Sequence, residues 1–227
     1  MLQCPPLFQR LGYNMFKKIS LLFGLIILSG CATHGVVTVP VQSAVENPAF
    51  TDKTFSTKLY YSQPKPGIFS SGEVLPMKPI EESELSVGAS RVLARYNELL
   101  TNQLPINTKV TSSENGDFLF ITELQAKDKS GPAYADYDMA LSTGKKLLTL
   151  GLGSSEYTII ADFDVTYKLL DRSGKLLLQD TYTVHDEVDH ERGGFDGFDI
   201  GQDLAAKLLE KNIVITMHDF FSKTNQI

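Results

Sequence analysis

The chain has 227 residues, with 27 acidic and 21 basic side chains and a net charge of −6 at pH 7. Because lysine and arginine must neutralise phosphates wherever a protein binds nucleic acid, an acidic chain is a poor candidate for that function, and no nucleic-acid partner is expected. Its only two cysteines, Cys4 and Cys31, exclude a disulfide-rich scaffold.

Near the amino terminus, a short apolar run follows two basic residues. Lys17 and Lys18 precede the apolar residues 19–28, after which two small residues lead to Cys31. A membrane-spanning helix needs about 20 apolar residues, roughly twice the length of this run. The layout is therefore typical of a secretory signal peptide, and the alternative is a short buried helix of the fold.

Residues 28–31, Leu-Ser-Gly-Cys, resemble the bacterial lipobox, the pattern that directs lipid onto the cysteine and cleavage just before it. The resemblance implies that Cys31 is the lipidation site, that residues 1–30 are a signal peptide, and that 1–14 lie upstream of the true start. An aspartate directly after the cysteine would resemble the signal for retention in the inner membrane, but Ala32 stands there. The resemblance therefore implies an outer-membrane lipoprotein that faces the periplasm.

Cleavage before Cys31 would leave a mature chain of 197 residues, enough for one domain with a sizeable core. It would also remove Arg10, Lys17 and Lys18 but no acid, so the net charge would change from −6 to −9. Such a chain has no electrostatic attraction to anionic lipid. We therefore expect the acyl chains to provide the membrane attachment, at about 0.8 kcal/mol per buried methylene.

A tether and a single domain are expected after the lipidation site. Residues 31–52 contain Pro40 and Pro48 and no helical period, so we expect a lipid-anchored tether there. Residues 53–227 are expected to form one α+β periplasmic domain.

The first half of this domain is expected to begin with a strand, a loop and a helix. Alternating residues predict a strand over 53–61, and four prolines predict a loop over 62–79. Apolar residues at spacings of three and four predict a helix that begins near Glu82 and ends before Pro105.

Alternation of apolar and polar residues returns in the second half. Residues 117–127 predict a strand, residues 128–136 a loop, and residues 137–150 fit either a helix or a strand. The clearest pattern covers 159–169, where apolar residues occupy one face and mostly polar residues the other. An Asp-Arg-Ser-Gly turn and a second alternating run over 176–184 complete a predicted hairpin.

A final helix is expected over residues 200–222. Asp199 is a natural N-cap, and Gln202 is placed to complete a capping box. Ile215 belongs to the apolar stripe, although the β-branched residues 213–216 weaken the helical tendency. Because amphipathic helices can cover one face of an alternating sheet, the predicted fold is a two-layer α+β sandwich, a mostly antiparallel sheet covered by two or three helices.

The order of these elements, together with the lipobox, resembles the small Gram-negative envelope lipoproteins of the YajG type. The matching segments are 91–104, 117–126, 159–184 and 204–221. The resemblance implies a non-enzymatic protein with no catalytic residues and no cofactor. By fold-level analogy, similar lipoproteins serve as accessory subunits of envelope assembly or transport systems, so an envelope protein is the expected partner besides the membrane.

One segment carries residues that metals prefer. His185, Asp189, His190 and Glu191 belong to a run with two imidazoles and four carboxylates, a ligand set suited to zinc or a similar ion. The spacing of five between the histidines fits no common ligand motif. The alternative is a solvated strand end that leads into a glycine-rich loop.

Three further features of the sequence contain residue types that occur in catalytic sites. Asp162 and Asp164 share one strand face and could act as an acid–base pair, but a solvated sheet face explains them as well. His218 is expected to be a packed or surface histidine rather than a base. Ser154 and Ser155 lie outside any nucleophile-elbow pattern, so a serine hydrolase has little support.

These observations leave three functions open. The first is an accessory or structural lipoprotein of the envelope, for which the loop with Tyr61 and Phe69 would suit partner docking. The second is a binder of a small ligand or lipid between helices and sheet. The third is a metal-assisted hydrolase based on His185 and His190.

Overall fold

The computed structural model describes residues 34–67, 72–111, 113, 115–137, 155–192 and 199–226. The chain divides into two compact units, Met1–Thr33 and His34–Ile227. The predicted signal peptide and Cys31 fall in the first unit, which lies outside the described residues. Every described element belongs to the second unit.

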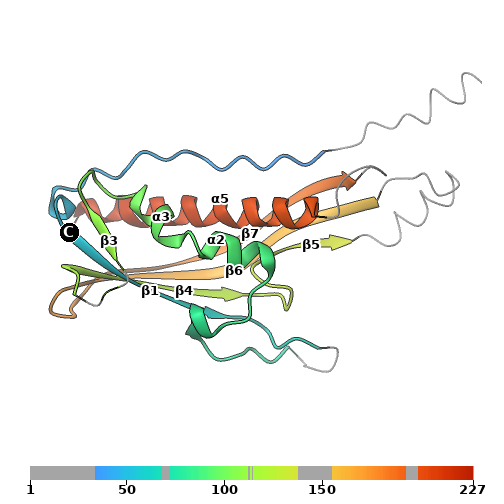
Figure 1. Cartoon of the computed structure of the whole chain (residues 1–227), viewed down its shortest axis with the longest axis horizontal. Coiled ribbons are helices and arrows are strands. Elements are labelled where there is room, and N and C mark those ends of the chain that lie inside the picture. Colours follow the sequence, from blue (N-terminus) through green and yellow to red (C-terminus); the bar gives the residue numbers. More distant parts are fainter. Residues whose placement is uncertain are drawn as a thin grey trace, which may run out of the picture. The chain divides into compact units, whose positions relative to one another are not determined.

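A mixed sheet of seven strands forms one layer of this unit (Figure 1). Its path runs β2-β1-β4-β6-β5, with β3 beside β1 and β7 beside β6. β1 pairs in parallel with β3 and β4, and the other pairs are antiparallel. The strands are β1 (Thr54–Ser62), β2 (Lys78–Pro79), β3 (Lys109–Thr111), β4 (Phe118–Ala126), β5 (Ala133–Tyr137), β6 (Ser155–Asp171) and β7 (Leu176–Arg192).

The hairpin of β6 and β7 has the longest strands of the sheet. Along β6, alternate residues from Ile159 to Leu169 are buried, and the residues between them are half-buried. In the connecting turn, Gly174 takes a φ of +83°, a left-handed conformation that glycine adopts without strain. The predicted hairpin is therefore confirmed, and both strands extend further at its open end than the sequence pattern indicated.

β1 and β4 confirm the strands predicted over 53–61 and 117–127. They pair in parallel, with Phe55 opposite Phe118. A parallel pair needs a long crossover connection. The crossover connection from β1 to β4 contains the helices α2 (Val87–Leu93) and α3 (Tyr96–Thr101), followed by β3.

The helix predicted from Glu82 to Pro105 begins later than expected. The segment opens with a 3-10 turn, η2 (Ile80–Glu82). The α-helical part starts after Ser86, whose hydroxyl accepts a hydrogen bond from the backbone N–H of Ala89 at 3.3 Å. The serine hydroxyl thus satisfies one of the free N–H groups of the first turn.

The predicted helix is also broken in the middle. Arg95, with φ −97° and ψ 11°, separates α2 from α3. α3 then begins at Tyr96, which is buried and shares a hydrogen bond between its hydroxyl and that of Thr122 on β4. A regular apolar period does not reveal such a break, because the residues on both sides of it are core residues.

The last helix, α5 (Ile200–Lys223), confirms the helix predicted over 200–222. The capping box was wrong, because the side chain of Asp199 makes no capping hydrogen bond and its backbone is already helical. Ile215 was also misplaced, since it is 39% exposed rather than part of the buried stripe. Among the described helices, none combines the length and the apolar character that a membrane span requires.

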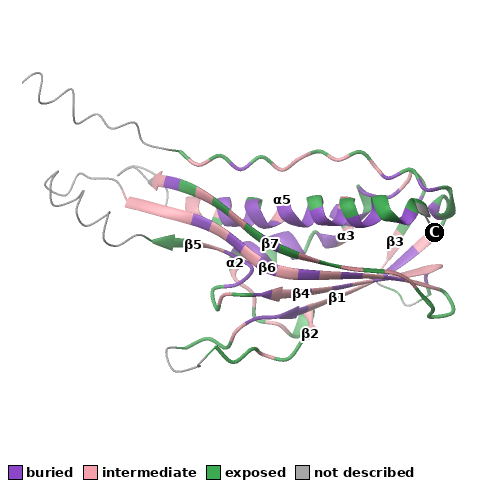
Figure 2. Ribbon diagram, turned by 180° about the vertical axis from the view of Figure 1, so that it is seen from behind, coloured by how far each residue is buried: buried purple, intermediate pink, exposed green. Residues whose placement is uncertain are grey.

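α2, α3 and α5 lie on the same face of the sheet, which confirms the predicted two-layer α+β fold (Figure 1). α5 contacts β5, β6, β7 and α2, so most of its circumference is buried (Figure 2). Burial of Ile213, Val214 and Thr216 explains how a β-branched segment stays helical, because tertiary packing overrides weak local propensity.

Residues 34–47 form an extended segment that runs alongside α5 in both views (Figure 1, Figure 2), and we name it the N-terminal strap. At one end, the Gly35 N–H donates to Nδ1 of His190 at 3.2 Å. At the other end, Asn47 Nδ2 donates to the carbonyl oxygen of Thr224 at 3.1 Å. The strap is therefore held at the end of β7 and at the end of α5.

The strap changes the expected domain boundary. Residues 31–52 were predicted to be a tether, yet the compact unit begins at His34. Val37 and Val45 of the strap are buried and belong to the core. Burial of their apolar side chains favours packing of the strap against the domain. The sequence interpretation missed this, because it considered only the absence of a helical period.

Two loop predictions also need correction. The loop expected over 128–136 contains most of β5, which pairs with the start of β6. Within the loop expected over 62–79, the backbone of Lys65 donates to the carbonyl of Glu73 at 2.7 Å, so its described parts pair with each other. The undecided segment 137–150 lies outside the described residues after Tyr137.

Aromatic side chains fill the core between the sheet and α5. Phe120 of β4 stacks on Tyr167 of β6 at a centroid distance of 5.5 Å, and Phe220 of α5 lies 5.5 Å from the same tyrosine ring. Phe50, in the 3-10 turn η1 (Pro48–Phe50), packs edge-on against Phe55 of β1 at 5.2 Å. The last described residues form a further 3-10 turn, η3 (Thr224–Gln226).

Candidate functional site

A cavity of about 310 Å³ lies where the first turns of α2 and α5 approach β5. We name it the amino-end cavity. Its volume falls at the lower end of the range of small-molecule pockets. Its walls include Val87 and Gly88 of α2, Ala133 and Ala135 of β5, Tyr157 of β6 and Gly201 of α5.

Two glycines lie in the wall of this cavity, where the elements meet. A Cβ atom on Gly88 would lie 3.2 Å from the carbonyl oxygen of Gln202, so glycine permits the close approach of α2 to α5. A Cβ atom on Gly201 would lie 3.1 Å from Cβ of Ala135. The helices and β5 thus meet closely at these two glycines.

The lining of the cavity is uncharged but partly polar. None of the described residues in its wall is an aspartate, glutamate, lysine or arginine. The side chains of Ser130, Tyr157 and Gln202 line it and make no hydrogen bond to another described residue. These groups keep their hydrogen-bonding capacity for water or for a ligand.

A second depression, of about 580 Å³, runs along the outer edge of β1. There β1 pairs with β3 over Thr54–Ser56 and with β2 at Tyr60 and Tyr61, while no described strand pairs with Thr57–Leu59 on that side. Its lining includes Lys58 and Glu81, so it differs in charge from the amino-end cavity.

The residues of the predicted metal site are not brought together. His185 is exposed, with Nε2 3.1 Å from Glu187 Oε1, whereas His190 is 3% exposed. An odd spacing along one strand puts their side chains on opposite faces of the sheet. Asp189 and Glu191 share the face of His185. Among the described residues, no group of three His, Cys, Asp or Glu side chains is arranged to hold a metal ion.

His190 instead contacts the strap. Its Nδ1 accepts the hydrogen bond from the Gly35 N–H, and its ring lies 5.9 Å from the ring of His34. A Cβ on Gly35 would come within 2.8 Å of the carbonyl oxygen of Asp189, so only glycine fits at this point of the strap. The buried imidazole is therefore a docking point for the amino-terminal segment.

Asp162 and Asp164 share one face of β6, as predicted, and both lie near the same cation. Lys127 Nζ is 3.7 Å from Asp162 Oδ1 and 3.0 Å from Asp164 Oδ1. Asp164 Oδ1 also accepts a hydrogen bond from the Thr183 hydroxyl at 2.7 Å. These contacts fit the second interpretation, a solvated sheet face, on which both carboxylates lie near a lysine.

The other residues singled out from the sequence have structural partners or fall outside the described chain. His218 is half-buried, with Nδ1 3.1 Å from Oε1 of the buried Gln103. Ser155 opens β6, while Ser154 lies outside the described residues. Tyr61 is buried and donates to Gln63 Oε1 at 2.7 Å, and Phe69 lies outside the described residues.

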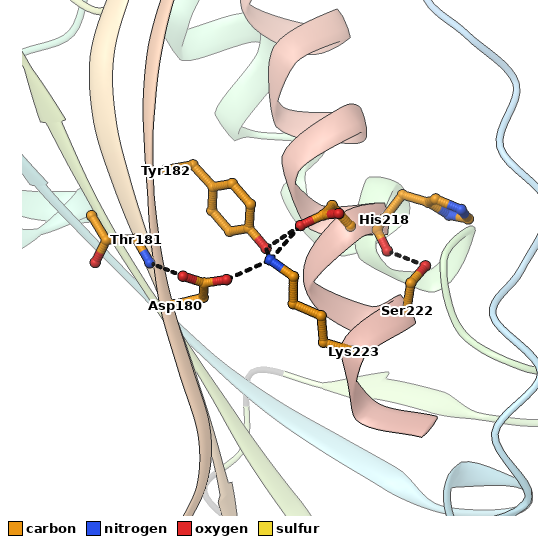
Figure 3. A network of polar contacts seen from close by, with 7 residues as sticks. Asp180, Thr181, Tyr182, His218, Ser222 and Lys223 are labelled. Atoms are coloured by element: carbon orange, nitrogen blue, oxygen red, sulfur yellow. Dashed lines mark hydrogen bonds and ion pairs between the residues drawn. The ribbon is translucent and has the colours of Figure 1, made fainter. Parts of the chain in front are cut away.

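One polar cluster joins the last turn of α5 to β7 (Figure 3). Lys223 Nζ lies 2.6 Å from Oδ2 of both Asp180 and Asp219. The Tyr182 hydroxyl donates to Asp219 Oδ2 at 2.8 Å, and the ammonium of Lys223 lies 4.8 Å from the centroid of the Tyr182 ring. We name these four residues the Lys223 cluster.

The Lys223 cluster shifts the pKa values of its members. Hydrogen bonds from Lys223 lower the pKa of Asp180 and Asp219 below the usual carboxyl range. Hydrogen bonds to Asp180, Asp219 and Tyr182 raise the pKa of Lys223. Burial raises the pKa of Tyr182. The cluster therefore holds a lysine cation between two carboxylates at neutral pH.

Pairs of small residues in the sequence indicated where α2 and α5 approach each other, although apolar periodicity does not distinguish small from large apolar residues. Gly88 and Ala89 lie in the stripe of α2, and Ala205 and Ala206 lie in that of α5. Small residues in the apolar stripes of two helices indicate that the helices cross at a short distance.

No protein-family model matches the chain, and no curated protein matches it. Among solved structures, protein XCC0632 of the DUF330 family from Xanthomonas campestris matches at 14% identity and a TM-score of 0.36, over 86% of this chain and 97% of the other. A neuraminyllactose-binding hemagglutinin homolog from Helicobacter pylori matches at 7% identity and a TM-score of 0.42, over 83% of this chain and 95% of the other.

A further uncharacterized protein matches at 11% identity and a TM-score of 0.35, over 79% of this chain and 98% of the other. At such TM-scores, these matches carry no conclusion about fold or function. The resemblance to YajG-type lipoproteins is not confirmed by them and stays a prediction.

Proposed function

We propose that this chain is an acyl-anchored lipoprotein of the bacterial outer membrane that faces the periplasm and serves the envelope as a non-catalytic accessory component. The observation that carries the proposal is the order of features before the domain. Lys17 and Lys18, the apolar residues 19–28 and the Leu-Ser-Gly-Cys run ending at Cys31 follow one another without interruption.

The start of the compact unit agrees with anchoring at Cys31. Only Ala32 and Thr33 separate Cys31 from His34, where that unit begins. Since the strap is hydrogen-bonded from Gly35 onward, an acyl anchor would hold the domain without a long flexible spacer. This is the arrangement expected of a component that works next to the membrane.

The contacts of the candidate acid–base residues support a non-catalytic role. Asp164 accepts from Thr183 and pairs with Lys127, and both contacts lie on the sheet surface. His185 lies 3.6 Å from Asp162 and 3.1 Å from Glu187, with 60% of its side chain exposed. These groups thus take part in a solvated network of the sheet.

The anchor is tested by replacing the predicted lipidation residue. In a Gram-negative host, wild-type protein should incorporate radiolabelled palmitate, fractionate with membranes and show an acylated Cys31 by mass spectrometry. Cys31→Ser should lose the label and the acylated terminus, because the thiol that carries the acyl chains is no longer present. An unmodified wild-type amino terminus upstream of Cys31 would refute the proposal.

The outer-membrane address is tested by Ala32→Asp, which adds the aspartate that resembles a retention signal. On a density gradient, wild-type protein should sediment with the outer membrane, and Ala32→Asp should move to the inner membrane while still labelled with palmitate. Ala32→Asn provides a control of nearly equal size without the charge. Equal distribution of the wild-type and Asp forms would contradict this part of the proposal.

The accessory role predicts a protein partner in the envelope. Crosslinking in intact cells, followed by mass spectrometry, should capture one envelope protein reproducibly with the wild-type chain. Capture of the lipoprotein-sorting machinery alone would count against an accessory role.

A further inference from the structure

β7 is an edge strand, and the hydrogen bonds of its neighbour β6 show which of its backbone groups face outward. The Asp162 N–H donates to the carbonyl of Pro132 at 3.0 Å, and the Asp162 carbonyl accepts from the N–H of Lys127 at 3.1 Å. Both groups therefore point away from β7, so Asp162 and its partner His185 form a non-hydrogen-bonded pair. The N–H and C=O of His185 face the outer side, as do those of every second residue over 181–187.

The outer side of β7 has backbone groups available for pairing. No described strand lies there. The Thr181 N–H agrees with the outward direction, because it donates to Asp180 Oδ1 at 2.9 Å rather than to β6 (Figure 3). The backbone groups of Thr183 and His185 make no hydrogen bond to another residue that the structure describes. Such an edge can accept a strand from another chain.

This open edge is bounded at both ends. At the end of β7 the N-terminal strap passes Asp189, where a Cβ on Gly35 would lie 2.8 Å from the carbonyl oxygen. Near the start of β7 the register with β6 shifts, opposite Leu169 and Leu170. Residues 179–188 remain between these points. They include no proline and no lysine, two residue types with which natural edge strands avoid pairing.

We infer that a second copy of this chain pairs with this edge, β7 against β7 in antiparallel orientation, with the two-fold axis beside Val184. Thr183 then lies opposite His185 of the second copy, and the outward N–H and C=O groups of the two residues bond to each other. Thr181 opposite Glu187 extends the ladder in both directions. The interface is isologous, because one segment pairs with itself.

The charges along β7 favour a second copy in this orientation. The side chains on the open face of the sheet are uncharged before Val184 and include two acids after it; they are Gln179, Thr181, Thr183, His185, Glu187 and Asp189. Antiparallel pairing places Thr181 opposite Glu187 and Tyr182 opposite Asp186, so no like charges stand directly opposite each other. Parallel pairing in register would bring Glu187 beside its own copy, which is destabilising.

The inference does not depend on the acyl anchor, because every residue used lies in the compact unit from His34 onward. The first test adds one cysteine to the full chain, either Thr183→Cys or Gln179→Cys as the matched control on the same exposed face. A two-fold axis beside Val184 puts the two copies of residue 183 about 8 Å apart, and those of residue 179 about 33 Å apart, at roughly 3.3 Å per residue.

A short bismaleimide reagent, added to the purified protein, should therefore crosslink Thr183→Cys into a dimer at least about tenfold more efficiently than Gln179→Cys. The wild-type chain, with Cys4 and Cys31, gives the background. Equal yields for the two cysteine variants would overturn the inference.

The second test removes an outward donor. His185→Pro deletes an N–H that does not bond to β6, so the β6–β7 ladder should persist and circular dichroism melts should show a folded variant. In light scattering, wild type should dimerise with a dissociation constant of about 10 μM or tighter, and His185→Pro should dimerise at least about tenfold more weakly. A wild type that is monomeric at about 100 μM, or a folded His185→Pro that dimerises like wild type, would also overturn the inference.

Discussion

At the residue scale, the Lys223 cluster shows how one exposed cation can fix a helix end. Lys223 is 44% exposed, and its two carboxylate partners are 35% and 52% exposed. Exposed ion pairs contribute little, about 0 to 1 kcal/mol each, because water screens them. The cluster nevertheless connects two elements, because it joins the last turn of α5 to the edge strand β7.

The lowered pKa values of Asp180 and Asp219 predict an acid-sensitive contribution to stability. A carboxyl whose pKa is lowered by folding stabilises the native state above its unfolded pKa of about 3.9, and this contribution is lost as the pH falls through the folded value. Lys223→Met should therefore reduce the free energy of unfolding by about 1 kcal/mol at pH 7.

The difference between wild type and Lys223→Met should shrink as the pH falls below about 4, because protonated carboxyls no longer attract the lysine. Urea unfolding at a series of pH values measures this. Lys207→Met, an exposed lysine on the same helix, is the matched control and should change stability little at any pH. A difference for Lys223→Met that stays constant down to pH 2 would contradict the argument.

At the element scale, the crossover between β1 and β4 contacts the backbone of β1 at one glycine, Gly116. The Gly116 N–H donates to Ser56 Oγ at 2.7 Å, just before β4 begins. A Cβ at this position would lie 2.6 Å from the backbone nitrogen of Ser56 and 2.8 Å from the carbonyl oxygen of Phe118. The connection therefore passes directly against the backbone of β1, with no room for a side chain.

Gly116→Ala should destabilise the protein by about 1 to 3 kcal/mol, because the methyl group forces the chain away from β1. The measurement is the urea midpoint at constant slope. Asn115→Ala, at the exposed neighbouring position, should have little effect. If both variants unfolded at the wild-type midpoint, the close approach of the crossover to β1 would be wrong.

The strands whose two faces differ in burial were predictable from the sequence, and the others were not. β6 alternates between buried and half-buried residues over most of its length, so its hydrophobic period matches its structure. β5 is short, and its residues Ala133 and Ala135 are too small to produce a recognisable period. The division of α2 from α3 escaped for a different reason, because buried residues lie on both sides of it and keep the apolar period regular.

The candidate site depends on the fold more than on any motif. Residues of the amino-end cavity such as Ser86, Ser130, Tyr157 and Gln202 come from four separate parts of the chain. Local spacing cannot bring such residues together. His185 and His190 show the converse, since they are neighbours in the sequence but lie on opposite faces of β7.

At the scale of the whole molecule, the compact unit includes the N-terminal strap in addition to the sheet and its three helices. Val37 and Val45 of the strap and Phe50 of η1 are buried in the same core as the aromatic side chains of β1, β4 and α5. The Val45 N–H also donates to the carbonyl oxygen of Gln103 after α3, at 2.9 Å. The amino-terminal segment is thus part of the cooperative structure.

A chain that starts at Lys53 should therefore be much less stable than one that starts at His34. Burial of a valine or phenylalanine side chain contributes about 1.5 to 3 kcal/mol, so removing Val37, Val45 and Phe50 should cost at least about 4.5 kcal/mol. Urea unfolding followed by circular dichroism measures the loss, and increased binding of a hydrophobic dye should accompany it. Within the full chain, Val45→Ala should be destabilising by about 1 to 2 kcal/mol, whereas Val41→Ala should be neutral because Val41 is fully exposed. Equal unfolding midpoints for the two chain lengths would show that the strap is a tether after all.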